Sequence, residues 1–193
     1  STQQFPARLI SMGSETQGPT SRANTEPFIQ TAMAPAKLEP YRFTIEEYLK
    51  MGEAEIISPE ERVELIDGQV VTMSPIGTWN YASVSLLYRA LADQIGGAYF
   101  LCPKCGLNIG RRTQLVPDMV VAIVDDPWVT GVRGEDCLLV VEVAQTSLSS
   151  DRTMKKAIYA SEGVPEYWIV DLAGRAVEVY RDPDNGDYTS KAA

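Results

Sequence analysis

The central stretch of the chain, residues 137–144, reads CLLVVEVA. Apart from Glu142 it is continuously apolar, as expected of a strand that is buried on both faces of a sheet. A second run, residues 118–124, reads DMVVAIV and is apolar after Asp118. Together the two runs predict the centre of an α/β or α+β domain.

The segments on either side of these runs carry ordinary helix and strand signals. Thr44 before Glu46 and Glu47 is typical of a capped helix with an acidic first turn. Asp67-Gly68 between two β-prone runs predicts a hairpin. The predicted helices cover residues 44–51, 80–95 and 151–162. The predicted strands cover residues 62–66, 69–73, 98–102, 107–111, 118–124, 137–144, 166–170 and 176–181. Between the two central strands, residues 125–136 are predicted to form a polar loop. The order of elements predicts a mixed central β-sheet flanked by helices, with an N-terminal helix and β-hairpin.

The domain boundaries follow from composition. Residues 1–40 are rich in Ser, Thr, Gln and Pro and have no apolar periodicity, so we predict a disordered or loosely docked tail. Residues 41–193 are predicted to form a single domain, because the chain of 193 residues can bury one substantial core. The charges of the tail cancel, so the folded part carries the whole net charge of −9.

Composition excludes several kinds of chemistry. The chain has no histidine, which rules out a Ser-His-Asp triad and a His-rich zinc site. Three cysteines give no disulfide framework, and we interpret Cys102-Pro103-Lys104-Cys105 as a tight turn between strands and not as half of a zinc site. No apolar run is long enough to cross a bilayer and no secretory pattern opens the chain, so we expect a cytoplasmic protein.

The two carboxylates in the apolar runs carry the strongest chemical signal. Burial of Asp118 and Glu142 is unfavourable unless each is paired or binds a metal. On neighbouring strands their side chains would lie roughly 5 Å apart, close enough to share one ion. Hard cations such as Mg²⁺ prefer oxygen ligands, and a bound metal lowers the pKa of its water. The alternative is that Glu142 is a structural ion-pair partner and Asp118 merely starts a strand.

A lysine on the following helix completes the arrangement. Asp151, Lys155 and Tyr159 are spaced four residues apart and share one face of the predicted helix. Lys155 could reach a metal-bound water or a phosphate as a positioned cation. The alternative is a surface salt bridge beside a packed tyrosine. Lys156 lies about 100° around the helix and cannot play the same role.

From Tyr41 to Tyr188 the chain resembles the Uma-two (Uma2) family of restriction-endonuclease-like proteins, long described as a domain of unknown function, in the PD-(D/E)XK nuclease-like superfamily. The resemblance rests on several short motifs in order: Arg42-Phe43-Thr44, Glu64-Leu65-Ile66-Asp67-Gly68, Met73-Ser74-Pro75, Pro117-Asp118, Val141-Glu142-Val143, Asp151 with Lys155 and Tyr159, and Gly163-Val164-Pro165-Glu166-Tyr167-Trp168-Ile169-Val170-Asp171.

The resemblance implies a restriction-endonuclease-like core with Asp118 and Glu142 as ligands of Mg²⁺, or of Mn²⁺. In the wider superfamily the catalytic lysine lies two residues after the acid, where this chain has Ala144. The family supplies it from the following helix, which is the place of Lys155. Glu64 matches a recurrent acid of the family, as a further ligand or a water-orienting group. Its alternative role is that of a solvated hairpin carboxylate.

One position departs from the family pattern. Relatives often have histidine in the stretch after Met-Ser-Pro, where this chain has Asn80, which can form hydrogen bonds but cannot act as a base.

The sequence therefore predicts a metal-dependent endonuclease that hydrolyses DNA phosphodiester bonds, with Lys155 stabilising the transition state. A homodimer is expected, since many nucleases of this fold cut two strands with two subunits. The net charge of −9 opposes tight, nonspecific binding to a polyanion, and with the missing histidine it favours one alternative, a catalytically inactive, nuclease-derived binding or regulatory module. A second alternative is a structural interaction protein in which the acids and the lysine form only an ion-pair network.

Overall fold

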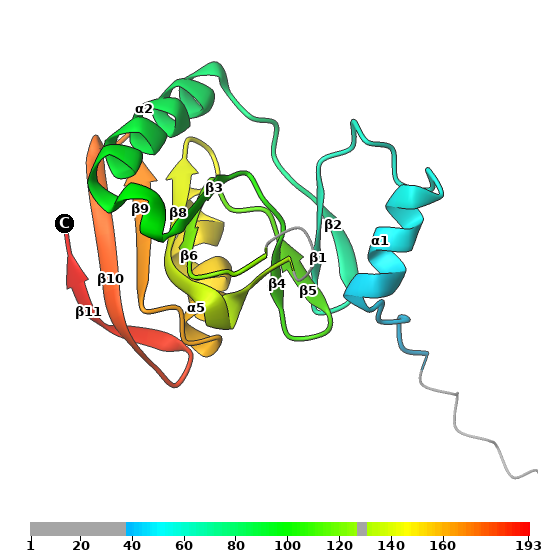
Figure 1. Ribbon diagram of the computed structural model, residues 1–193. Coiled ribbons are helices and arrows are strands. Elements are labelled where there is room, and N and C mark those ends of the chain that lie inside the picture. The colour runs from blue at the N-terminus through cyan, green and yellow to red at the C-terminus, as the bar shows by residue number, and fades with distance from the viewer. Residues whose placement is uncertain (1–37, 127–130) are drawn as a thin grey trace, which may run out of the picture. The chain divides into compact units, whose positions relative to one another are not determined.

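The computed structural model describes residues 38–126 and 131–193, and Glu39–Ala193 form one compact unit (Figure 1). The predicted tail therefore lies almost wholly outside the described residues. The helices are α1 (Ile45–Glu53), α2 (Thr78–Ile95), α4 (Leu148–Ser150) and α5 (Lys156–Ser161), the 3-10 turns η1 (Gly96–Ala98) and η2 (Gly134–Asp136), and the π-helix η3 (Asp151–Lys155). The strands are β1 (Val63–Ile66), β2 (Gln69–Thr72), β3 (Phe100–Pro103), β4 (Leu107–Ile109), β5 (Thr113–Leu115), β6 (Met119–Ala122), β7 (Val132–Arg133), β8 (Cys137–Ala144), β9 (Glu166–Asp171), β10 (Ala176–Asp184) and β11 (Asp187–Ala192).

The described strands form two mixed sheets, a larger one that contains both central runs and a smaller one that contains the predicted hairpin. The larger has the order β11-β10-β9-β8-β6-β3, with β8 and β9 parallel and the other neighbours antiparallel. The smaller has the order β2-β1-β5-β4-β7, with β4 and β7 parallel. The predicted hairpin is thus the edge of a second sheet, and the turn at Cys102–Gly106 connects strands of different sheets.

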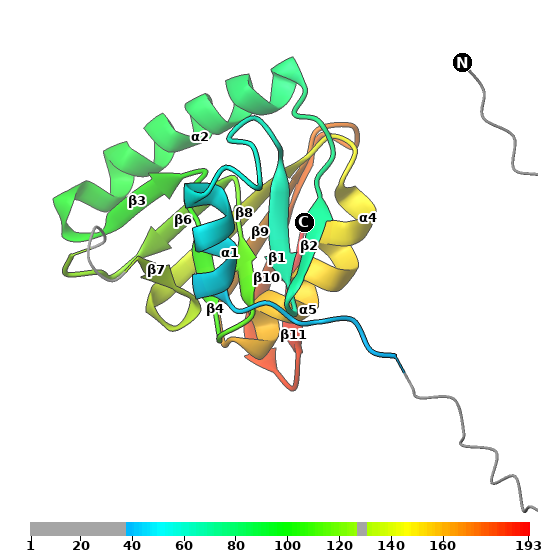
Figure 2. The same cartoon turned by 90° about the vertical axis from the view of Figure 1, so that its right-hand side faces the viewer.

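The two central runs lie where their apolar sequence predicts. β6 and β8 are antiparallel neighbours, and all four residues of β6 are buried. On β8 the side chains alternate between two core clusters: Val141 and Val143 pack with α2, whereas Val140 and Ala144 pack with α5 and the second sheet. Figures 1 and 2 show α2 and α5 on opposite sides of the larger sheet. Glu142 shares the side of Val140, so its carboxylate is directed toward α5.

Local signals account for the N-terminal helix and the hairpin. Thr44 and Glu47 form a reciprocal capping box at the start of α1, in which each side chain bonds the other's backbone N–H. Asp67 and Gly68 both have positive φ angles, of 47° and 74°, which suits a tight turn matching the twist of β1 and β2. The capped helix and the Asp-Gly hairpin are both confirmed.

Two predicted segments differ from the structure. The predicted loop over residues 125–136 contains β7 and η2, although residues 127–130 are outside the described part. The helix predicted over residues 151–162 begins earlier, with α4 at Leu148, and continues as a π-helix in which Lys156 N–H donates to Asp151 O. Asp151, Lys155 and Tyr159 are nevertheless all buried, and Lys155 and Tyr159 both bond Glu142, so the expected shared face is confirmed. No helix of the described residues is long and apolar enough to span a membrane.

Candidate functional site

Asp118 and Glu142 lie at the point where the pairing of β6 and β8 ends. Met119 is opposite Val141 in the register, so Asp118 stands one step beyond the last paired residue of β6. Its side chain continues the hydrogen bonding to β8 beyond the last paired residue, because Val143 N–H donates to Asp118 Oδ2 at 2.6 Å. Both acids are 5% exposed. The structure thus brings the two sequence-predicted acids to one end of the central strand pair.

The first turn of α2 completes the surroundings of Asp118. Asn80 Nδ2 donates to Asp118 Oδ2 at 3.2 Å and to Val143 O at 2.8 Å. Gly77, the N-cap of α2, lies so close to Gln145 that a Cβ at this position would clash with the Gln145 side chain. This close approach brings the start of α2 against the end of β8. Asn80 can therefore form hydrogen bonds both to β8 and to Asp118.

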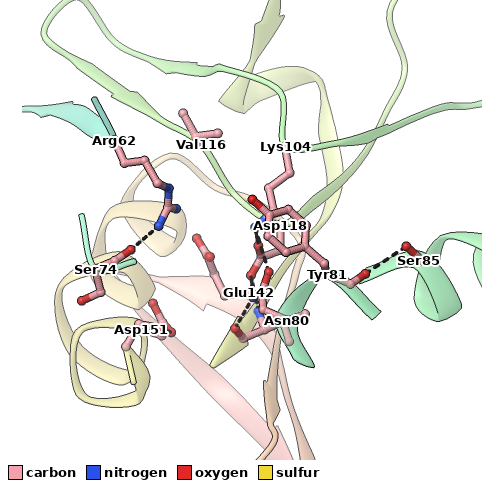
Figure 3. A network of polar contacts seen from close by, with 12 residues as sticks. Arg62, Ser74, Asn80, Tyr81, Ser85, Lys104, Val116, Asp118, Glu142 and Asp151 are labelled. Atoms are coloured by element: carbon pink, nitrogen blue, oxygen red, sulfur yellow. Dashed lines mark hydrogen bonds and ion pairs between the residues drawn. The ribbon is translucent and has the colours of Figure 1, made fainter. Parts of the chain in front are cut away.

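Lys104 is a part of this site that the sequence did not identify. Its ammonium forms an ion pair with Asp118 Oδ1 and donates to Asn80 Oδ1 at 3.1 Å (Figure 3). Lys104 has a φ angle of 53°, in the left-handed region that is uncommon for residues other than glycine. Only the turn between Cys102 and Cys105 was predicted here, and nothing in that motif indicates which way the lysine points.

Glu142 is held by groups from the helix that follows β8. Glu142 Oε1 accepts hydrogen bonds from Lys155 Nζ at 2.9 Å and from Tyr159 OH at 2.8 Å. Lys155 is 5% exposed and Tyr159 is completely buried, so the alternative of a surface salt bridge is wrong. Lys156 instead pairs with Asp187 outside the site.

Glu64 reaches the same lysine from the second sheet. Its Oε1 lies 3.4 Å from Lys155 Nζ and accepts a hydrogen bond of 2.7 Å from Val116 N–H. At 2% exposure it is not the solvated hairpin carboxylate that we considered as its alternative role. Lys155 therefore links the two sheets by bonding Glu64 on one and Glu142 on the other.

Asp151 is a further buried acid beside this group. Its Oδ2 accepts a hydrogen bond of 2.6 Å from Ser147 Oγ. Its Oδ1 is buried and has no hydrogen-bond partner among the residues that the structure describes. The sequence placed Asp151 on the stripe of Lys155, but its role was not predicted.

A cleft of about 390 Å³ opens over these groups. It is lined by residues of both sheets, of α2 and of the helical segment after β8. Its charged lining residues are Arg62, Glu64, Lys104, Asp118, Glu142 and Lys155. Figure 3 shows Arg62 on the opposite side of the view from Lys104, with its guanidinium bonded to Ser74 O. The cleft therefore offers both acids and cations to a ligand.

Burial and neighbouring charges shift the pKa values of the ionisable groups in the cleft. Burial raises the pKa of Glu142 from its ordinary 4.5 to about 8; Lys155 opposes this shift, and the carboxylates of Asp118, Asp151 and Glu64 add to it. Burial alone would lower the pKa of Lys155, but Glu142 and Glu64 raise it above its ordinary value. The raised pKa of Glu142 and the raised pKa of Lys155 are compatible, because several acids surround one lysine. The lysine keeps its proton, and the neutral form of Glu142 is favoured.

The donor chemistry fits a hard divalent cation. Asp118 and Glu142 would hold it through carboxylate oxygens, which such cations prefer. In the described residues no group of three or more acids, cysteines or histidines is arranged around a common point. Water and substrate oxygens would therefore have to complete the coordination, as is usual for Mg²⁺.

Comparisons with known proteins agree with this geometry. A family model named Uma2 and described as "Putative restriction endonuclease" matches residues 45–193. Among solved structures, the chain is similar to one described as a "putative nuclease belonging to DUF820" from Anabaena variabilis, at 17% identity and a TM-score of 0.61. The match covers 78% of this chain and 83% of that one. The comparison with curated proteins gave no match. The expected family and the restriction-endonuclease-like fold are both confirmed.

Proposed function

The chain belongs to the Uma2 family, and from this premise we propose that it is a divalent-cation-dependent endonuclease that hydrolyses phosphodiester bonds in DNA. The observation that carries the proposal is the meeting of Asp118 and Glu142 at the end of β6 and β8, in a cleft that Lys155 also lines. The nuclease description of the similar solved structure supports the same class of reaction.

Hydrolysis of a phosphodiester requires an activated water and neutralisation of the charge on the phosphate. A bound Mg²⁺ or Mn²⁺ would supply a water of lowered pKa and would polarise the phosphate oxygen. Asp118 and Glu142 are proposed as its protein ligands. The Val143 N–H and the Asn80 amide hold Asp118 in one orientation, which favours a preorganised site.

The lysine of the helical segment has two proposed roles. Lys155 fixes the Glu142 carboxylate through a 2.9 Å ion pair, and it places a permanent positive charge at the wall of the cleft. A cation at that position would stabilise the charge that develops on the phosphate in the transition state. Glu64 is proposed to hold this lysine and to orient water, from its position 3.4 Å from Lys155 Nζ.

DNA is the proposed substrate and a homodimer is the proposed assembly, the latter by analogy with nucleases that cut two strands. The net charge of −9 favours a second candidate, a nuclease-derived binding or regulatory module without turnover. The two functions differ in one respect that can be measured, namely whether the cleft turns over a phosphodiester.

The test is incubation of the protein with supercoiled plasmid and Mg²⁺ or Mn²⁺, with EDTA as the metal-free reference. Asp118→Asn keeps the shape of the side chain but removes its charge, and we expect it to abolish nicking. Asp171→Asn is the matched control, because Asp171 is a buried carboxylate at the end of β9 that does not line the cleft. Equal nicking by all three proteins would point to a contaminant. Metal binding without nicking would favour the regulatory module.

A further inference from the structure

Among the described residues, Lys104 is the hydrogen-bond donor to Asp118 Oδ1, whereas Oδ2 has two other donors. Asp118 Oδ2 already accepts hydrogen bonds from Val143 N–H and from Asn80 Nδ2. Asp118 Oδ1 is therefore the oxygen that could coordinate a metal, and the ammonium of Lys104 is bonded to it. A divalent cation and this ammonium would compete for the same lone pairs.

The position of Lys104 would allow its ammonium to leave Asp118 and be replaced by a cation. Its side chain is 26% exposed, in contrast to the 6% of Lys155, so its ammonium can move without crossing packed core. It extends from the turn between β3 and β4 and lines the cleft. The ring of Tyr81 lies 5.9 Å from the ammonium and offers it a second favourable surface nearby. Figure 3 shows Lys104 reaching toward Asp118 beside that ring.

We propose that Lys104 is an exchangeable counterion of Asp118, which neutralises Oδ1 in the metal-free protein, yields it to a divalent cation, and then binds a phosphate oxygen of the substrate. The inference rests on the proposed function. It assigns to Lys104 two opposite effects, because the same ammonium weakens cation binding and assists the reaction once the cation is bound. A purely structural ion pair would not produce that combination.

The test measures both effects on the same variants. Ca²⁺ and Mn²⁺ are titrated calorimetrically into the parent protein and into Lys104→Met, and plasmid nicking is followed with Mg²⁺. We expect the variant to bind either cation about 5- to 10-fold more tightly, because its competitor is gone. We expect nicking to fall by about 10- to 100-fold, as is usual when a group supporting a metal site is lost.

A matched control and a conservative variant separate this role from general charge effects. Lys156 pairs with Asp187 at 2.7 Å, lies 5.5 Å from the ring of Tyr180 and is 21% exposed, but it does not line the cleft. Lys156→Met should therefore leave cation affinity and nicking unchanged. Lys104→Arg keeps the positive charge, so it should retain the weaker cation binding of the parent and restore part of the nicking.

The outcomes distinguish this inference from the proposed function. Cation affinity that is equal or weaker in Lys104→Met overturns the exchange, and tighter binding with undiminished nicking overturns the phosphate contact. A parent protein that binds cations but never nicks DNA refutes the proposed endonuclease, while the change in affinity still decides the exchange. A parent protein that binds no divalent cation overturns both.

Discussion

Asp118 and Glu142 are paired with lysines in different ways. Asp118 takes its cation from Lys104, on a turn that is partly open to solvent. Glu142 takes its cation from Lys155, on a packed helical segment that also bonds Glu64 on the other sheet. One half of the site is therefore part of the core, whereas the other half can rearrange without disturbing it. A site that must hold its shape and still admit a metal and a substrate needs both properties.

The largest expected difference between the halves is in stability. Lys155→Met would leave Glu142 and Glu64 buried without their cation, and breaking such a pair costs about 3–5 kcal/mol of unfolding free energy. Lys104→Met removes the partly exposed cation of buried Asp118, which keeps its hydrogen bonds from Val143 and Asn80, so a smaller loss of about 2 kcal/mol is expected. Urea unfolding of both variants in EDTA measures the comparison. Equal losses would show that the two halves are not distinct.

An effect of pH is also expected, and it belongs to the buried half. Folded Glu142 keeps its proton up to about pH 8, whereas the unfolded residue loses it near 4.5. The folded state thus binds more protons across this window, so the free energy of unfolding should fall as pH rises through it, by about 1.4 kcal/mol per pH unit. Urea unfolding in EDTA across the window tests this. Glu142→Gln should show a much flatter profile, and a slope unchanged from the parent would refute the assignment to Glu142.

The smallest effect is expected at the tyrosine that supports Glu142. Tyr159→Phe keeps the ring that packs 5.0 Å from the ring of Tyr167 but removes the hydroxyl that donates to Glu142 Oε1. Loss of this buried hydrogen bond should lower the unfolding free energy by about 1 kcal/mol. Tyr81→Phe is the control beside Lys104, where the exposed hydroxyl should contribute almost nothing to stability. Equal unfolding free energies of the two variants would show that the Tyr159 hydroxyl does not stabilise the buried half of the site.

The acids and Lys155 could be predicted from the sequence, whereas Lys104 could not. Asp118 and Glu142 stand out because a charge within an apolar run needs a partner. Lys155 follows from helical spacing, even though the segment Asp151–Lys155 is a π-helix. Lys104 gave no such signal, because its position depends on a turn geometry and on strands from two sheets. Asn80 was recognised only as a departure from the family, and its bonds to Asp118 and Val143 came from the structure.

The fold shows a similar limit. The strands with long apolar runs were predicted, whereas β5 and β7 are too short to give a pattern. β11 was missed although Asn185-Gly186, both with positive φ, is the turn signal that would have indicated its hairpin with β10. The division into two sheets depends on pairing between distant segments, such as β1 with β5, which local sequence does not specify.

The most direct test of the account is calorimetric titration of Mn²⁺ into the parent protein, Asp118→Asn, Glu142→Gln and the control Asp171→Asn, all first freed of metal with EDTA. The proposed sharing of one ion by Asp118 and Glu142 requires that the parent and the control bind the cation, and that either substitution in the cleft abolishes or strongly weakens binding. Cation binding that survives in both cleft variants, or that is absent from the parent, would contradict it.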